Sequence, residues 1–337
     1  MQRSKTLISQ ALATLKGNMD RTGDPLGFKG VYWNGWARGL GLPDSGETVL
    51  LTARMYQMLP FVAQATEMSA AARPLLPLLA VNAFSKMALM AGDLVGEPLL
   101  RLKAKAETEI RSRGNLALQG ISCALKVAGC QPAYLYDTEP YSGALLFDLG
   151  LDAEIAPHVR LVYRTLKGRG VKTVITVDPH TTYMMREVFP RYISNYDLGV
   201  VHYLDLLASS SRPLEATPGN TLPEEFVIHD SCVMTRDLGI VAQTRKVAAG
   251  MGFRILEPEN AKGNTACCGG PVEYAFGDLS SAISGIRIRE LAGVCRDVLV
   301  TCPICLINLM KYENDLGIRV WDMGELLLGA RAGTCTP

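Results

Sequence analysis

The chain repeats one order of segments twice, and this internal duplication limits its fold more than any other feature. Residues 174–185 (VITVDPHTTYMM) parallel residues 298–310 (VLVTCPICLINLM), and residues 198–208 (LGVVHYLDLLA) parallel residues 316–328 (LGIRVWDMGELLL). Internal similarity of this kind predicts two structural units of the same type. Residues 209–220 (SSSRPLEATPGN) have the Ser, Pro and Gly content of a linker between the copies.

Within each copy, short apolar runs rich in β-branched residues alternate with amphipathic helical stretches. This alternation is typical of α/β units with largely parallel strands. In the second copy we predict strands at 225–230, 253–258, 298–301 and 319–322, and helices at 236–250, at 272–291 and after the last strand. The sequence thus predicts an α/β fold built from two duplicated domains with mostly parallel sheets.

Composition and charge exclude several classes of function. The net charge of +1 gives no field that would attract nucleic acid, so no nucleic-acid partner is expected. The charged N-terminus lacks the apolar core of a secretory signal, which favours a cytoplasmic protein. In that compartment the nine cysteines are expected to be reduced ligands or catalysts rather than disulfides.

Five of these cysteines form the pattern C…CC…CxxC in the second copy. Thirty-four residues separate Cys232 from Cys267, 33 separate Cys268 from Cys302, and Cys302 and Cys305 form the CxxC. Each group lies where a predicted strand gives way to a loop or helix. Because the carboxyl ends of parallel strands meet at one edge of a sheet, we expect the five thiols to lie close together.

Five thiolates at one point repel one another unless a cation neutralises them. Soft sulfur ligands select iron–sulfur clusters, zinc or copper, so the pattern predicts a metal centre and favours an iron–sulfur cluster. Gly269 and Gly270 would let the backbone approach the cluster and direct N–H groups at its sulfurs. The alternatives are buried core cysteines, a four-ligand structural zinc site, and a thioredoxin-like dithiol at residues 302–305.

The segments DSC, CCGG and TCPIC around these cysteines resemble the repeated cysteine-rich (CCG) domain of the catalytic, B/D-type subunit of heterodisulfide reductases. Related iron–sulfur subunits of glycolate and lactate oxidation are similar, as is a heterodisulfide reductase-like branch associated with sulfur oxidation. The resemblance covers residues 45–330. It implies a non-cubane 4Fe-4S cluster at which disulfides are reduced or formed.

The resemblance also divides the chain. Residues 1–45 stand outside the repeat, and their Gly, Pro and aromatic content predicts an irregular arm that wraps its own core or a partner. Residues 46–210 form a degenerate CCG-type domain, and residues 221–337 form the cluster-binding CCG domain. The apolar insertion at 74–100 is interrupted by charges and is too short to span a bilayer, so no transmembrane segment is expected. It is an interior helix, a partner-facing surface or a site of peripheral membrane contact.

The first copy has lost every matching ligand. Aligning the repeats places Arg54 opposite Cys232, residues 141–143 opposite 267–269, and residues 178–181 opposite 302–305. Enzymes with two such clusters give one sulfur of a disulfide to each, as the resemblance implies. With one cluster here, symmetrical cleavage by this chain alone is in doubt.

The vacated first site allows three interpretations. Arg54, Tyr141, Asp178 and His180 would share one pocket if the copies superpose, and they would hold the polar part of a substrate. Arg54 would then bind an anionic group and His180 would pass a proton to a departing thiolate, so these two are the candidate catalytic residues. The alternatives are structural replacement of a lost site and a hard-metal site that uses Asp178 and His180.

Some cysteines and histidines match no motif. The cysteines outside the motif are Cys123, Cys130, Cys295 and Cys335. His229 precedes Cys232 by three residues, so its side chain either reaches the cluster or bonds to nearby backbone, the interpretation we favour. His158 and His202 have no assigned partner.

These features predict an enzyme subunit that is active only within a complex. It would be the iron–sulfur subunit of a heterodisulfide reductase-like complex and would exchange electrons with a thiol or disulfide. The chain lacks the cysteine runs of ferredoxin domains and the GxGxxG loop of nucleotide-binding domains. Electrons are therefore expected from a ferredoxin-like iron–sulfur subunit and a flavin-containing subunit. The alternative is an electron-transfer or scaffold subunit, of the glycolate or lactate oxidation type, whose cluster never touches substrate.

Overall fold

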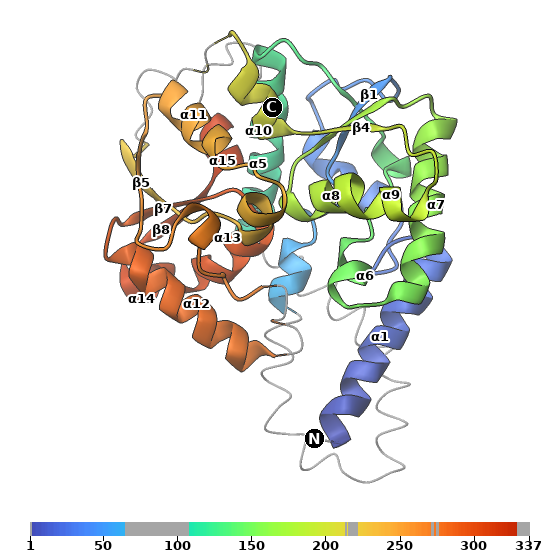
Figure 1. Ribbon diagram of the computed structural model, residues 1–337, viewed down its shortest axis with the longest axis horizontal. Coiled ribbons are helices and arrows are strands. Elements are labelled where there is room, and N and C mark those ends of the chain that lie inside the picture. Colours follow the sequence, from blue (N-terminus) through green and yellow to red (C-terminus); the bar gives the residue numbers. More distant parts are fainter. Residues whose placement is uncertain are drawn as a thin grey trace.

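Two all-parallel, four-stranded sheets form the core of the protein (Figure 1). The computed structural model describes residues 2–64, 108–212, 214, 222–270, 273 and 276–328. The first sheet has the order β2-β1-β3-β4, with strands Thr48–Leu51 (β1), Ala133–Tyr134 (β2), Thr173–Thr176 (β3) and Gly199–His202 (β4). The second has the order β6-β5-β7-β8, with strands Glu225–Ile228 (β5), Arg254–Leu256 (β6), Asp297–Val300 (β7) and Arg319–Asp322 (β8). The predicted α/β fold with parallel sheets is confirmed.

Helices connect the strands of both sheets. In the first unit they are Thr108–Val127 (α5), Ala144–Asp148 (α6), Asp152–Gly168 (α7), Pro179–Tyr183 (α8), Phe189–Tyr192 (α9) and Tyr203–Ser209 (α10). In the second they are Ala242–Gly250 (α11), Gly277–Ala292 (α12), Pro303–Leu309 (α13), Glu313–Leu316 (α14) and Met323–Leu328 (α15). The helix expected at 236–250 is divided in two: Val233–Asp237 form a π-helical turn and α11 begins at Ala242, with Gly239 at a positive φ of 67° between them.

The two copies share local backbone geometry at the aligned loops. Asp178 and Cys302 are the N-caps of α8 and α13, and each is followed by a proline in the first turn of the helix. Gly143 and Gly269 have φ values of 87° and 88°. This correspondence supports the repeat alignment at these two loops. At the third, Arg54 has a φ of 66° whereas Cys232 has a φ of −59°, so the backbones differ there.

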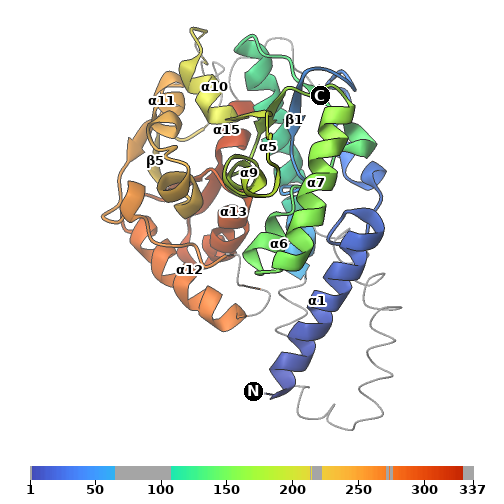
Figure 2. The ribbon, with the colours of Figure 1, turned by 45° about the vertical axis from the view of Figure 1, so that its right-hand side comes forward.

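Helices from opposite copies pair between the two sheets. Helix α5 of the first unit packs on α15 of the second, and α10 of the first packs on α11 of the second. Each pair joins the helix after the first strand of one copy to the helix after the last strand of the other. Figures 1 and 2 show these helices between the sheets. The pairing is the one expected for two copies related by a pseudo-twofold axis.

The N-terminal arm packs on the first unit. Residues Gln2–Thr22 form helix α1, which the prediction of an irregular arm missed, and α1 projects from the body of the protein (Figure 2). The residues after it are irregular, with short 3-10 turns, as their Gly and Pro content predicts. Trp33 and Trp36 are 3% and 1% exposed, so the arm wraps the core of its own chain.

Some sequence predictions lie outside the described residues. These include the apolar insertion at 74–100, most of the linker at 209–220 and the C-terminal Cys335. Among the residues that the structure describes, no helix is long and apolar enough to cross a membrane. All strands of the first sheet fall within residues 46–210, and all strands of the second within 221–337.

The close contact of α5 with α15 depends on two glycines. A Cβ added at Gly120 would lie 1.9 Å from the carbonyl oxygen of Gly324. We therefore expect Gly120→Ala to lower the free energy of unfolding by about 1–3 kcal/mol, because the helices must move apart. Denaturant unfolding followed by circular dichroism measures this change. Gly168→Ala in α7 is the matched control, since no atom lies within 4 Å of the added carbon; equal losses in both variants would contradict the prediction.

Candidate metal centre

Three loops at the carboxyl edge of the second sheet bring the five cysteines together. Cys232 follows β5, Cys267 and Cys268 lie in the loop that leads to α12, and Cys302 and Cys305 begin α13. Each side chain interacts with the next in the order Cys232, Cys267, Cys268, Cys305 and Cys302. The convergence expected from the strand ends is therefore present.

Glycine shapes the loop that carries the paired cysteines. Gly269 has a positive φ, and its backbone N–H donates a hydrogen bond to Sγ of Cys267 at 3.3 Å. A Cβ at Gly269 would lie 2.5 Å from the carbonyl oxygen of Ser280, and one at Gly270 would lie 2.3 Å from Cγ2 of Ile304. Both glycines thus allow the close backbone approach that the sequence predicted, and Gly269 supplies an N–H to a sulfur.

The thiols perturb one another strongly. Burial alone would raise the pKa of Cys302, but hydrogen bonds from Cys305 and His180 hold it well below the ordinary value. The pKa of Cys267 is lowered by hydrogen bonds from Cys232 and Cys268. Two thiolates are therefore favoured within the group, and thiolate is the form that binds metals. Full deprotonation of all five would require a bound cation.

The donor set tests which metal group fits. Cys268, Cys302 and Cys305 are 3%, 1% and 3% exposed, and Cys232 and Cys267 are half-buried. Five soft sulfur donors exceed the four ligands of a tetrahedral structural zinc site. Thiolate donors with a backbone N–H directed at sulfur suit an iron–sulfur cluster. The residues present therefore fit such a cluster, while their role as its ligands stays a prediction.

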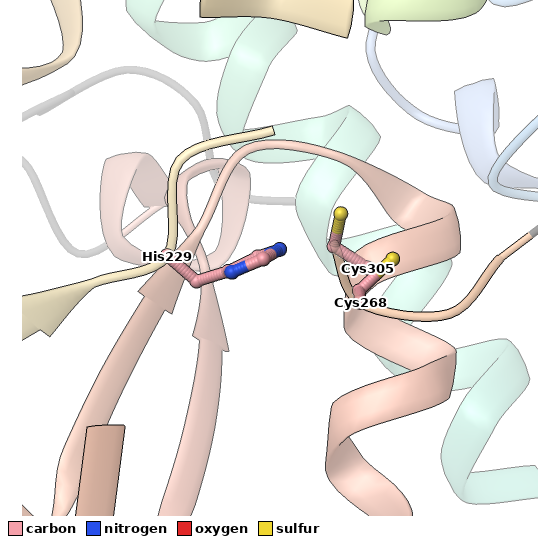
Figure 3. Close-up of side chains that lie close together, drawn as sticks. All are labelled: His229, Cys268 and Cys305. Carbon is pink, nitrogen blue, oxygen red and sulfur yellow. The ribbon is translucent and has the colours of Figure 1, made fainter. Parts of the chain in front are cut away.

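His229 lies at the same site (Figure 3). One of its ring nitrogens and the Sγ atoms of Cys268 and Cys305 all lie within 4.8 Å of one another. Its Nδ1 accepts a hydrogen bond from Nε of Arg287 at 3.0 Å, so the side chain does not bond to backbone as we favoured. Burial and the nearby Arg287 lower the pKa of His229 to about 3. Sequence reasoning missed Arg287, because it lies 58 residues away in the middle of α12 and belongs to no motif.

His180 links the first copy to the cysteines of the second. Its Nδ1 lies 3.2 Å from Oδ2 of Asp148, and its ring also forms a hydrogen bond with Cys302. Burial lowers the pKa of His180, but the bonds to Asp148 and Cys302 outweigh burial and raise it well above the ordinary value. A cavity of about 140 Å³ adjoins this group, and its lining includes His180, Asp148, Val233 and Asp237. None of the five cysteines lines this cavity, but His180, which interacts with Cys302, does.

Comparison with known proteins gives the same assignment for the second unit. Residues 226–310 match the family model described as CCG, a cysteine-rich domain. The second unit carries a CCG domain. The chain is also 26% identical over 247 residues to a protein of Syntrophomonas wolfei subsp. wolfei named EtfAB:quinone oxidoreductase, covering 69% of this chain and 31% of that one.

A second relative is a probable membrane-anchored ferredoxin of Chromohalobacter salexigens. It is 25% identical over 235 residues, which are 66% of this chain and 34% of the relative. The chain thus spans about a third of the length of these relatives.

The vacated site of the first copy is filled by internal contacts around Arg54. The Arg54 guanidinium forms a buried ion pair with Asp24 of the arm and donates a hydrogen bond to the carbonyl oxygen of Glu139 at 2.7 Å. Arg54 and Tyr141 line a cavity of about 400 Å³, whereas His180 lines the smaller cavity beside the CCG site. Arg54 and His180 thus line different cavities, although we expected them to share one pocket.

The Asp178 carboxylate caps α8 rather than joining a metal-binding group. Its Oδ1 accepts a hydrogen bond from the backbone N–H of Thr181 at 2.9 Å, and burial raises the pKa of Asp178 to about 6. Among the described residues, no group of three potential metal donors includes Asp178 and His180. A hard-metal site at Asp178 and His180 would therefore lack a third protein ligand among the described residues.

The first prediction for this site is that the five cysteines act as one metal centre. Replacing any of them by serine should remove most of the bound iron or alter the EPR spectrum, because a harder ligand binds the cluster less well. Cys123→Ser, in α5 of the first unit, is the control and should retain the iron content of the parent. Unchanged iron and EPR spectra in all five variants would contradict the prediction.

Proposed function

We propose that this chain is the iron–sulfur subunit of a heterodisulfide reductase-like complex that exchanges electrons with a thiol or disulfide substrate. Cys232, Cys267, Cys268, Cys302 and Cys305 would hold one non-cubane 4Fe-4S cluster. The observation that carries the proposal is the group of five interacting cysteines, with His180 next to Cys302 and lining a cavity. The CCG domain and the names of the relatives support the assignment.

Reduction of a disulfide to two thiols consumes two electrons and two protons. When bound, the cluster would supply single electrons to a sulfur next to it. Nδ1 of His180 pairs with Asp148, so Nε2 is the nitrogen that would act on a substrate, and the ring also interacts with Cys302. Asp148 thereby fixes the orientation of the ring, and His180 holds a proton at Nε2 for a departing thiolate. The adjoining cavity would receive the sulfur that bears this proton.

The proposed reaction needs a source of electrons. We propose the ferredoxin-like iron–sulfur subunit and the flavin-containing subunit expected from the sequence as their source. The relatives support this placement, since one is named an oxidoreductase that acts between EtfAB and quinone and the other a ferredoxin. The chain would then serve as one electron-transfer step of a multi-subunit complex.

Burial of three cysteines favours a second candidate function, electron transfer without contact between cluster and substrate. Cys268, Cys302 and Cys305 are almost completely covered, and the cavity beside them is small. A cluster held there would pass electrons without touching substrate, as in a subunit of the glycolate or lactate oxidation type. The relative named a ferredoxin is consistent with such a role.

Metal analysis with EPR spectroscopy tests both functions. Anaerobically purified protein should contain about four irons and no zinc, because one cluster of this type holds four irons and the first copy has no thiolate ligands. Adding a thiol should change the EPR signal if the cluster meets substrate. An unchanged signal would favour the second function, and near eight irons or stoichiometric zinc would contradict the single-cluster assignment.

The role of His180 has a separate test. In His180→Ala and Asp148→Asn we expect normal iron content, weaker thiol-induced EPR changes and turnover slowed by about 10²–10⁴ in the assembled complex, as for loss of a general acid. His158→Gln is the control, because His158 bonds to the Tyr141 carbonyl oxygen in the other cavity. A thiol-induced EPR change as large as that of the parent in both variants would show that His180 takes no part in the mechanism.

Arg54 is tested in the same assay. The proposed substrate role predicts that Arg54→Ala weakens the thiol response while iron is retained. A loss of stability with an unchanged thiol response would instead make Arg54 structural, as its buried pair with Asp24 favours.

A further inference from the structure

His229 is held between a fixed cation and the cysteines of the CCG domain. Arg287 is fully buried, and its guanidinium has three partners. Its Nε donates to Nδ1 of His229 at 3.0 Å, Nη1 donates to Oε2 of Glu290 at 2.8 Å, and Nη2 donates to Oγ1 of Thr265 at 3.4 Å. These contacts fix the guanidinium against the imidazole ring.

The bond from Arg287 decides which nitrogen of His229 carries the proton. A guanidinium stays protonated in proteins and only donates hydrogen bonds. Nδ1 of His229 must therefore be an acceptor without a proton. A neutral imidazole has one N–H, so the proton lies on Nε2.

Nε2 of His229 is buried and has no hydrogen-bond partner among the described residues. Figure 3 shows the ring directed at Cys268 and Cys305, whose Sγ atoms lie within 4.8 Å of a ring nitrogen. A buried N–H without an acceptor is costly, so a group of this kind calls for an acceptor at the site. A protonated nitrogen has no lone pair in the ring plane with which to bind a metal.

We propose that His229 donates a hydrogen bond from Nε2 to a sulfur of the cysteine-bound cluster rather than binding iron, and that Arg287 is the positioning residue that fixes this tautomer. The inference rests on the proposed iron–sulfur site. Hydrogen bonds to sulfur are among the factors that set the reduction potential of such clusters. Because reduction adds negative charge, a donor at sulfur stabilises the reduced form and raises the potential.

The test is a redox titration of the full chain, purified anaerobically and followed by EPR. His229→Leu should keep the iron content of the parent while the oxidised-to-reduced ratio at a fixed ambient potential rises on the order of tenfold, which is about 59 mV for a one-electron couple. His229→Phe is a second variant without a donor, in case the first fails to fold. His229→Gln retains an N–H and should shift the potential less than either.

The positioning role of Arg287 is tested by combining its substitutions with His229→Leu. Arg287→Met removes the donor that fixes the tautomer and should lower the potential in the parent, whereas Arg287→Lys keeps a donor-only cation and should restore part of it. If Arg287 acts through His229, the shift caused by Arg287→Met becomes smaller in the His229→Leu background. Equal shifts in both backgrounds would assign Arg287 a purely electrostatic effect and overturn its positioning role.

Two further outcomes would overturn the role of His229 itself. Loss of iron in both His229→Leu and His229→Phe, with normal folding by circular dichroism, would make it a ligand. Retained iron with an unchanged potential would show that it donates no hydrogen bond to the cluster. A parent chain without iron would overturn the proposed function together with this inference, so the two failures are distinguishable.

Discussion

Mutual repulsion among five crowded thiolates is the constraint on which the second half of the protein depends. The thiols meet because parallel strands end at one edge, and the buried positions of Cys302 and Cys305 leave little water to screen their charges. Neighbouring cysteines raise the pKa of Cys232 and lower the pKa of Cys267, so one thiolate forms at the expense of the other. The proposed cluster would resolve this conflict by supplying positive charge, and the N–H of Gly269, which already donates to Cys267, would share the remaining charge.

The first copy supports this site instead of repeating it. Its α8 places His180 against Cys302, while its own vacated loops are closed by the ion pair of Arg54 with the arm. The helix pairs α5–α15 and α10–α11 fix the two sheets relative to each other, so the imidazole from one copy reaches a thiol of the other. Loss of ligands in one copy has thus made the two halves chemically different while their packing stays similar.

The sequence predicted what depends on local pattern. Strands such as β7 and β8 were located within a residue, because their β-branched runs are short, apolar and bounded by loops. The five cysteines lie close together, as the strand-end rule predicts from topology alone, while their role as ligands stays a prediction. The contacts of His180 with Asp148 and of Arg287 with His229 were not predictable, because each joins residues far apart in the chain through side-chain packing. Helix α1 was missed because the glycines and prolines after it dominated the composition of the arm.

The matched loops of the two copies bear on the order of assembly. Gly143 and Gly269 adopt the same left-handed conformation, and prolines follow Asp178 and Cys302 at the same helical position, yet only one copy has cysteines there. The loop conformation is therefore set by glycine, proline and the strand ends, not by coordination. A cradle set in this way would be able to form before a cluster binds. Delivery of the proposed cluster would then be a separate step of maturation, unlike the coupled folding of small zinc domains.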